Sequence, residues 1–172
     1  MEHSSRILLL VLAALIASFS VADTASSKLS IGDTLAELAL PPVMGGYAKS
    51  LNEQRGKPVM LIWVGPCHQC REALEQYEQL ARQYSKNGLV TWVIWDTDDQ
   101  LVKDAPHTSL PLLAYNQKLT RAWQINPLPA VMLVSPDGTL DYLYAGSLFR
   151  NMEFTRRALS HWLSGDGVVH QR

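Results

Sequence analysis

Cysteine is scarce in this sequence: there are two among 172 residues, Cys67 and Cys70. A framework of disulfides between distant segments is therefore excluded, although such frameworks stabilise many small exported domains. A bridge between two cysteines three positions apart closes a very small loop, so it constrains the unfolded chain little. Stability is thus a poor explanation for the pair, and redox chemistry is a better one.

A strong charge of either sign is also absent. The formal net charge is -1 and no run of basic residues stands out. Neither nucleic-acid binding nor electrostatic docking on a membrane is therefore indicated. The chain does have a hydrophobic content of 47% over 172 residues, without an internal repeat. Those values suit one compact domain with its own core.

The first segment differs in character from the rest. Met1–Arg6 is short and polar, residues 7–17 are almost purely apolar, and Ser20-Val21-Ala22 supplies small residues. This layout predicts a secretory signal peptide over residues 1–22, followed by one domain over residues 23–172. The alternative is an uncleaved anchor, although the apolar stretch falls short of the roughly 20 residues that span a bilayer comfortably. We therefore expect a periplasmic or otherwise exported protein, soluble after cleavage and membrane-anchored if the segment is retained.

Hydrophobic periodicity predicts alternating strands and helices. Residues 58–64 are a continuous apolar run bounded by breakers, typical of a strand buried on both faces. From residue 70 the apolar positions recur at helical spacing as far as residue 84. The further predicted elements are two short strands within 35–51, a strand over 89–95, a short helix over 101–107, a strand over 111–115, a helix over 119–125, a hairpin of 130–134 with 140–144, and a helix over 150–163. This order indicates an α/β sandwich around a mixed sheet.

The two cysteines stand where the buried strand gives way to the long helix. Unpaired N–H groups and the macrodipole give a helix N-terminus about half a positive charge, which stabilises a thiolate. Cys67 lies at that terminus, and Cys70 lies one turn further in, on the core-facing side. We therefore expect Cys67 to attack a substrate disulfide and Cys70 to resolve the mixed disulfide. His68 stands between them, either as a tuning cation or as an exposed bystander.

The segment from Trp63 to Arg71, the helix after it and the block from Asn126 to Gly138 resemble the thioredoxin-like family of exported bacterial thiol–disulfide oxidoreductases of the TlpA, ResA and CcmG type. The resemblance runs from about Ile31 to Leu163. It implies a thioredoxin fold, with a mixed central sheet flanked by helices and an N-terminal strand extension. It also implies a redox-active disulfide as the working group, with no other cofactor and no metal.

The resemblance implies a cis proline opposite the dithiol, and Pro129 matches that position. A cis bond there would turn the backbone of Leu128 toward Cys67, ready to pair with an extended substrate chain. An ordinary trans proline at the start of an edge strand is the alternative. Pro127 is interpreted as a plain loop residue.

The sequence departs from the family pattern at several positions. Pro66 replaces the tryptophan that often precedes the first cysteine, and Gln69 replaces the proline that often precedes the second. Ala73 and Leu61 occupy positions where relatives carry an acid. No obvious base is then left to deprotonate Cys70, which leaves the strength and direction of the redox chemistry open.

The resemblance favours a reductase of disulfides in other exported proteins, kept reduced by a membrane electron donor and acting as a monomer. Apocytochrome c thiols, and hence cytochrome c biogenesis, are one possible substrate class. An oxidase of the same fold is an alternative, as is a copper-binding chaperone that uses Cys67, His68 and Cys70. A redox-inert interaction domain is disfavoured by the retained cysteine pair. A peroxidase of the peroxiredoxin type is disfavoured because Val64 stands where a peroxide-binding hydroxyl residue is needed.

Overall fold

The computed structural model describes residues 29–35, 38–96, 104–115, 123 and 125–164. The predicted signal peptide, residues 1–22, lies outside them, as does most of the helix predicted over residues 119–125. The helix predicted over residues 101–107 is wrong for its described part: residues 105–107 form no regular secondary structure, since Pro106 disfavours a helical conformation at Ala105. Over the described ranges, no helix combines the length and the apolar character needed to cross a bilayer.

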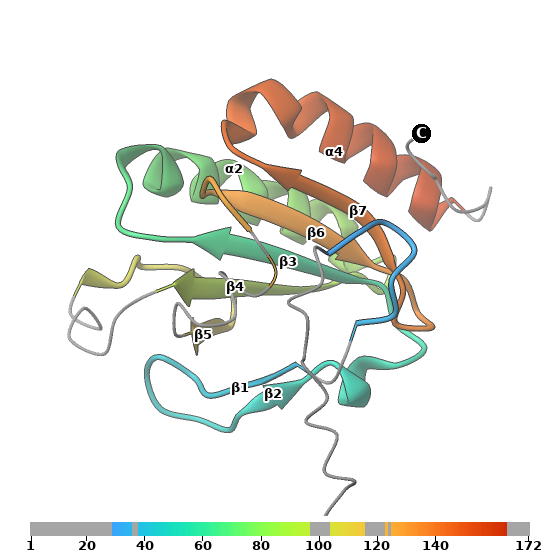
Figure 1. Cartoon of the computed structure of the whole chain (residues 1–172), viewed down its shortest axis with the longest axis horizontal. Helices are drawn as coiled ribbons and strands as arrows, with labels where there is room; N and C mark the ends of the chain where they lie inside the picture. The colour runs from blue at the N-terminus through green and yellow to red at the C-terminus, as the bar shows by residue number, and fades with distance from the viewer. Residues whose placement is uncertain (1–28, 36–37, 97–103, 116–122, 124, 165–172) are drawn as a thin grey trace, which may run out of the picture.

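A five-stranded mixed sheet forms the centre of the molecule (Figure 1). Its strands are β3 (Val59–Val64), β4 (Val90–Asp96), β5 (Leu112–Tyr115), β6 (Ala130–Val134) and β7 (Leu140–Ala145), in the spatial order β5-β4-β3-β6-β7. β3 pairs parallel with β4 and antiparallel with β6, and all its residues are buried. The mixed sheet and its central apolar strand are as predicted.

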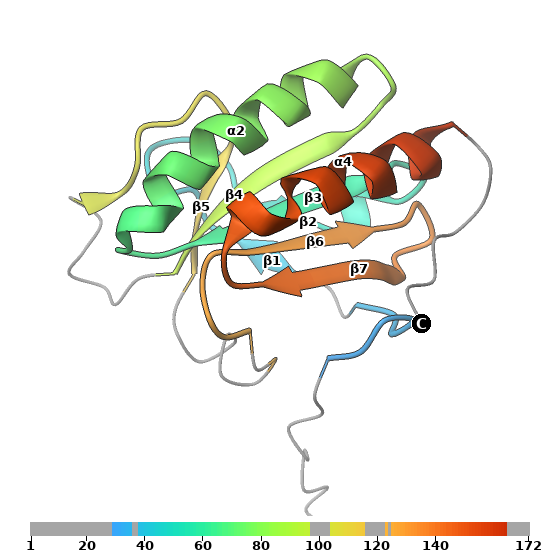
Figure 2. The same cartoon turned by 90° about the horizontal axis from the view of Figure 1, so that it is seen from above.

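Two helices cover one face of the sheet (Figure 2). They are α2 (His68–Ser85) and α4 (Leu148–Leu163). The side chains of alternate β3 residues, Met60, Ile62 and Val64, pack with the apolar stripe of α2 in one core cluster. Gly88, with a φ of 85°, lies just beyond the end of α2, so the Asn87-Gly88 helix stop is confirmed.

A buried polar contact joins the two helices to the sheet. The Thr155 hydroxyl of α4 lies 3.3 Å from the Tyr77 hydroxyl of α2 and 3.3 Å from the Tyr142 hydroxyl of β7. Burial raises the pKa of Tyr77, so its phenol stays protonated. The contact fixes α2, which carries the dithiol, against the rest of the domain.

The opposite face of the sheet is covered by the N-terminal extension. Its elements are β1 (Ala39–Leu40), β2 (Lys49–Ser50) and a 3-10 turn (Asn52–Gln54). β1 and β2 pair antiparallel, and Leu40 of β1 and Leu51, the residue after β2, pack with the β3 side chains that face away from α2 in a second core cluster. The predicted strand-turn-strand is confirmed, although each strand has only two residues.

Candidate active site

β3 ends at Val64, and a short turn through Gly65 and Pro66 leads to the disulfide between Cys67 and Cys70. Cys67 caps the N-terminus of α2 with a φ of -115°, and its sulfur accepts a hydrogen bond from the backbone N–H of Cys70 at 3.2 Å. The Cys70 sulfur accepts a hydrogen bond from the backbone N–H of Gly65 at 3.4 Å. The helix therefore offers an N–H group to the sulfur that would carry charge when the bond is reduced.

The two sulfurs differ in accessibility. Cys70 is 3% exposed and belongs to the core cluster under α2. Cys67 is half-buried and lies at the wall of an open cleft. A macromolecular disulfide can therefore reach Cys67, while Cys70 is placed to attack Cys67 from inside. This arrangement supports the roles expected for the two cysteines.

The three residues around the dithiol that were expected to tune it are all exposed. They are Pro66, His68 and Gln69. The His68 side chain is 89% exposed, and its Nδ1 lies 3.8 Å from Glu72 Oε1 one turn along the helix. This is a solvent-facing pair, so any charge on the imidazole is shared with a carboxylate and screened by water. The structure therefore favours the bystander interpretation of His68.

The proline loop before β6 lies beside the dithiol turn. The Leu128–Pro129 bond is cis, in agreement with the resemblance. The Asn126–Pro127 bond is cis as well, although Pro127 had been interpreted as a plain loop residue. A Cβ added to Gly65 would meet the Leu128 side chain at 3.0 Å. Glycine at position 65 thus lets the loop approach the turn closely.

The two positions where relatives carry an acid are filled by buried apolar side chains. Leu61 is 0% exposed and belongs to the cluster on the face away from α2, while Ala73 is 2% exposed beneath α2. A buried acidic residue whose backbone adjoins the turn is Asp96 at the end of β4, 9% exposed, with its backbone oxygen 3.8 Å from where a Cβ on Gly65 would lie. Sequence reasoning did not single out Asp96, although an acidic residue at the end of an apolar strand was a usable signal.

An open cleft of about 880 Å³ adjoins Cys67. Its walls are the dithiol turn, the outer face of α2 and the segment 104–107 that follows β4. Its charged lining residues are four carboxylates and one guanidinium, namely Glu72, Glu75, Glu78, Asp104 and Arg71. Glu72, Glu75 and Glu78 share one face of α2 through the helical period, and the fold adds Asp104 from the segment after β4.

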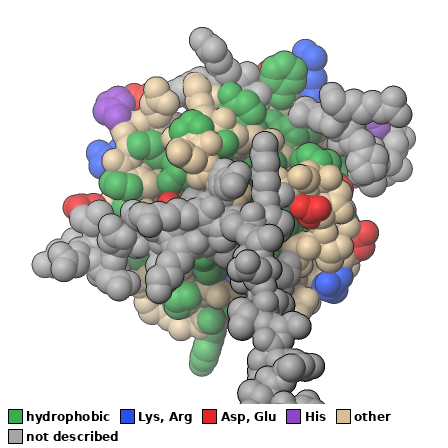
Figure 3. All heavy atoms as spheres, in the orientation of Figure 1, with side chains coloured by type: hydrophobic (Ala, Val, Ile, Leu, Met, Phe, Trp, Pro, Cys, Tyr) green, Lys and Arg blue, Asp and Glu red, His purple; other side chains and the backbone are tan. Residues whose placement is uncertain are grey.

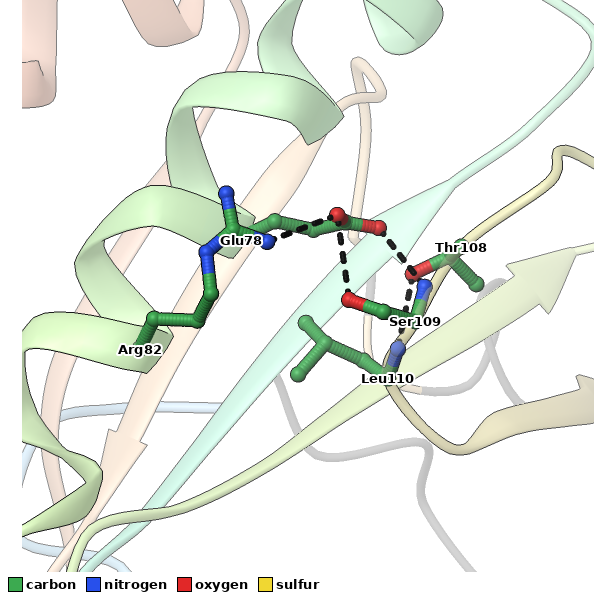
Figure 4. A network of polar contacts seen from close by, with 5 residues as sticks. All are labelled: Glu78, Arg82, Thr108, Ser109 and Leu110. Atoms are coloured by element: carbon green, nitrogen blue, oxygen red, sulfur yellow. Dashed lines mark hydrogen bonds and ion pairs between the residues drawn. The ribbon is translucent and has the colours of Figure 1, made fainter.

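Glu78 fastens the far wall of this cleft (Figure 4). Its carboxylate accepts hydrogen bonds from the Ser109 backbone N–H at 3.1 Å and the Ser109 hydroxyl at 3.2 Å, and lies 3.3 Å from an Arg82 guanidinium nitrogen. The Thr108 hydroxyl also bonds to it. Burial alone would raise the pKa of Glu78, but the bonds from Thr108, Ser109 and Arg82 outweigh it, so the pKa lies below its usual value.

Glu78→Gln will lower the free energy of unfolding at about pH 7 by about 1 to 3 kcal/mol, because charge-assisted bonds to a side chain only 15% exposed are lost. Because the pKa of Glu78 is lower in the folded state than in the unfolded state, its charge stabilises the fold at pH values above the unfolded-state pKa. This stabilisation is lost as the pH falls through the folded-state pKa. The difference between parent and variant will therefore shrink toward pH 4. Urea unfolding at both pH values measures it, with the exposed Glu75→Gln as the control. An equal loss at both pH values would contradict the role given to the charge.

Two rival chemistries find no support at this site. Val64, three positions before Cys67, is 0% exposed in the core under α2, so no hydroxyl stands there to bind peroxide. In the part of the chain that the structure describes, no three His, Cys, Asp or Glu side chains gather closely enough to hold a metal ion.

The fold and the disulfide at the start of α2 define a thiol–disulfide oxidoreductase of thioredoxin fold. Residues 31–143, well over half of the chain, match the model of the AhpC/TSA family, and the chain belongs to that family. The family resemblance inferred from the motifs is thereby confirmed. No match to this sequence was found among the curated proteins.

Solved structures from several bacteria share the fold. A protein assigned as the thiol:disulfide interchange protein DsbE of Chlorobium tepidum superposes with a TM-score of 0.69 at 18% identity, covering 79% of this chain and 99% of that one. The thioredoxin domain of a thiol-disulfide oxidoreductase from Bacteroides vulgatus gives 0.60 at 17% identity, with 74% and 99% covered. The exposed lipoprotein thioredoxin Etrx1 of Streptococcus pneumoniae gives 0.56 at 18% identity, with 69% and 99% covered.

Proposed function

We propose that this protein reduces disulfides in other exported proteins through Cys67 and Cys70. The Cys67 thiolate attacks one sulfur of the substrate disulfide, forming a mixed disulfide and releasing the first substrate thiolate. The Cys70 thiolate then attacks the Cys67 sulfur, re-forming the bridge of the oxidised protein and releasing the second substrate thiolate. Two electrons pass from the dithiol to the substrate. An exported dithiol donor, kept reduced from the membrane, restores the reduced protein.

The negative charge around Cys67 is the observation that favours a reductase over an oxidase. A stable thiolate favours the reduced form and makes a disulfide a better oxidant, whereas nearby negative charge destabilises the thiolate. Apart from Glu78, which is paired with Arg82, the cleft beside Cys67 carries three carboxylates against the guanidinium of Arg71, and the neighbouring imidazole of His68 points to solvent with Glu72. The carboxylates therefore oppose the helix terminus and lower the reduction potential. The dithiol is then poised to donate electrons.

Replacing Glu72 and Glu75 together with glutamine will raise the reduction potential by about 10 to 30 mV, since it removes two screened negative charges near the thiolate. Equilibration with glutathione measures the shift. Glu53→Gln, an exposed change on the other face of the sheet, is the control and will leave the potential unmoved. A lower reduction potential in the double variant would contradict the effect proposed for the two carboxylates.

Support for export comes from the signal-like layout of residues 1–22, which lies outside the described structure. Two structural neighbours bear the names DsbE and exposed lipoprotein thioredoxin, which agree with that location. The mature chain would then meet substrates in an oxidising compartment, where disulfides that need reduction are common. The disulfide of an oxidised apocytochrome c, reduced to its thiols, is one member of that substrate class.

The proposed activity is tested by the reduction of insulin disulfides, with dithiothreitol as the electron source. The protein will accelerate the precipitation of the insulin B chain above the rate with dithiothreitol alone. An oxidase would instead accelerate the oxidation of a reduced, unfolded protein and would show little insulin reduction. The absence of both activities would remove the proposal.

A further inference from the structure

We propose that the substrate's polypeptide docks in a groove that extends from Cys67 to the hairpin between β1 and β2, where Met44 and Tyr47 act as apolar anchors. The occupant is an extended segment next to the disulfide under attack, with apolar side chains that reach the hairpin. This inference rests on the proposed function and adds to it a substrate class: disulfides carried on accessible, apolar stretches of protein chain.

The groove consists of two adjoining hollows. The first is the cleft at Cys67, and the second, of about 760 Å³, lies between the hairpin and segment 106–113. Glu78, Pro106 and His107 line both of them. A chain bound at Cys67 can therefore continue past these residues into the second hollow. That continuity with the reactive sulfur identifies the occupant as the protein that carries the disulfide.

The far end of the groove is apolar and exposed. Met44 is 73% exposed and lines the second hollow, and so does Tyr47, which is 92% exposed. Phe154 on α4, 52% exposed, is the other large hydrophobic residue exposed within the described ranges. Figure 3 shows hydrophobic side chains reaching the surface at the lower edge of the molecule, where the hairpin lies in Figure 1. Side chains of this kind serve as anchors when a partner covers them.

The hairpin is held in place at its base. The Val43 N–H donates to the Leu112 carbonyl at 2.9 Å, and the Ala114 N–H donates to the Pro41 carbonyl at 2.8 Å. These bonds fasten the first arm of the hairpin to the edge strand β5. In Figures 1 and 2 the hairpin turn, the segment before β5 and the start of α2 lie toward the same side of the molecule. The anchors are thus presented on the side that carries the dithiol.

The Glu78 network gives the groove a fixed middle wall. By bonding to Thr108 and Ser109, its carboxylate holds the segment before β5 against α2. Both hollows share this wall, so the path between them is already formed before a substrate arrives. A preformed path lowers the ordering cost of binding an extended chain.

The test compares two disulfide peptides with a small disulfide. Each peptide carries one cysteine bonded to glutathione; leucines alternate with serines around it in the first, and serines alone surround it in the second. The small disulfide is oxidised glutathione. Reduced protein, the double variant Met44→Ser with Tyr47→Ser, and the matched control Phe154→Ser are assayed for KM and kcat.

The double variant will raise KM for the leucine peptide about tenfold, equivalent to about 1.4 kcal/mol, with kcat unchanged. The serine peptide, oxidised glutathione and Phe154→Ser will show parent values. Three results would overturn the docking inference: an unchanged KM for the leucine peptide, an equal rise in KM with Phe154→Ser, or a dimer that the double substitution dissociates. The proposed function would stand in each case, provided that the protein still reduces oxidised glutathione. Failure of the parent to reduce oxidised glutathione would instead remove the proposed function itself.

Discussion

Replacing Cys70 with serine will convert the protein into a trap for its substrates. Cys67 remains at the helix N-terminus beside the open cleft and can still attack a disulfide. The sulfur that would release the adduct, buried at 3% exposure beneath α2, is gone. Covalent complexes will therefore accumulate in cells that produce this variant, and they will disappear on treatment with dithiothreitol. Non-reducing electrophoresis followed by mass spectrometry measures them and identifies the partners.

Cys67→Ser is the matched control, because it changes the same atom type three residues away. It will form no complexes and will have no insulin reductase activity above the background rate. If the Cys67 variant formed as many covalent complexes, the roles assigned to the two cysteines would be wrong. Trapping by neither variant would mean that the pair does not act on protein disulfides.

Trp63→Ala will cost about 3 to 5 kcal/mol in the free energy of unfolding, the range found for large aromatic side chains deleted from a core. The Trp63 side chain is 0% exposed in β3, four residues before Cys67. Its ring makes edge contacts with Tyr115 at 5.3 Å and Trp123 at 5.9 Å between centroids. Deleting it removes those contacts and leaves a cavity on the sheet face opposite α2. Urea unfolding measures the loss.

Trp63→Phe separates packing from hydrogen bonding. Among the described residues the buried Trp63 Nε1 has no hydrogen-bond acceptor, so phenylalanine gives up no such bond and keeps most of the apolar contact. Its cost will be less than half that of Trp63→Ala. Equal costs for the two variants would show that the indole ring contributes something other than packing.

The elements that position the dithiol were readable from local patterns. The apolar run of residues 58–64 and the helical spacing after Cys70 each depend on neighbours in the chain, so β3 and α2 were predicted within two residues of their observed bounds. The burial of Cys70 followed from the same helical period. The cis bond before Pro129 came from the family resemblance, because nothing in the spacing distinguishes it from the one before Pro127.

Features that depend on distant residues could not be predicted in this way. Glu78 and Ser109 are separated by 31 positions, and only the fold brings them together. The negative lining of the cleft depends on the fold only for Asp104, since Glu72, Glu75 and Glu78 recur at helical spacing in α2. The direction of the His68 side chain, toward Glu72 and solvent, depends on a rotamer that a sequence does not specify.

The reduction potential of the Cys67–Cys70 couple tests the central claim most directly. The protein is equilibrated in glutathione or dithiothreitol buffers, and the reduced fraction is counted by thiol alkylation and mass spectrometry. The account predicts a single two-electron transition below about -200 mV, nearer to the value of about -270 mV for thioredoxin than to the value of about -120 mV for the oxidant DsbA. A potential near -120 mV, or a disulfide that does not exchange with either buffer, would contradict it.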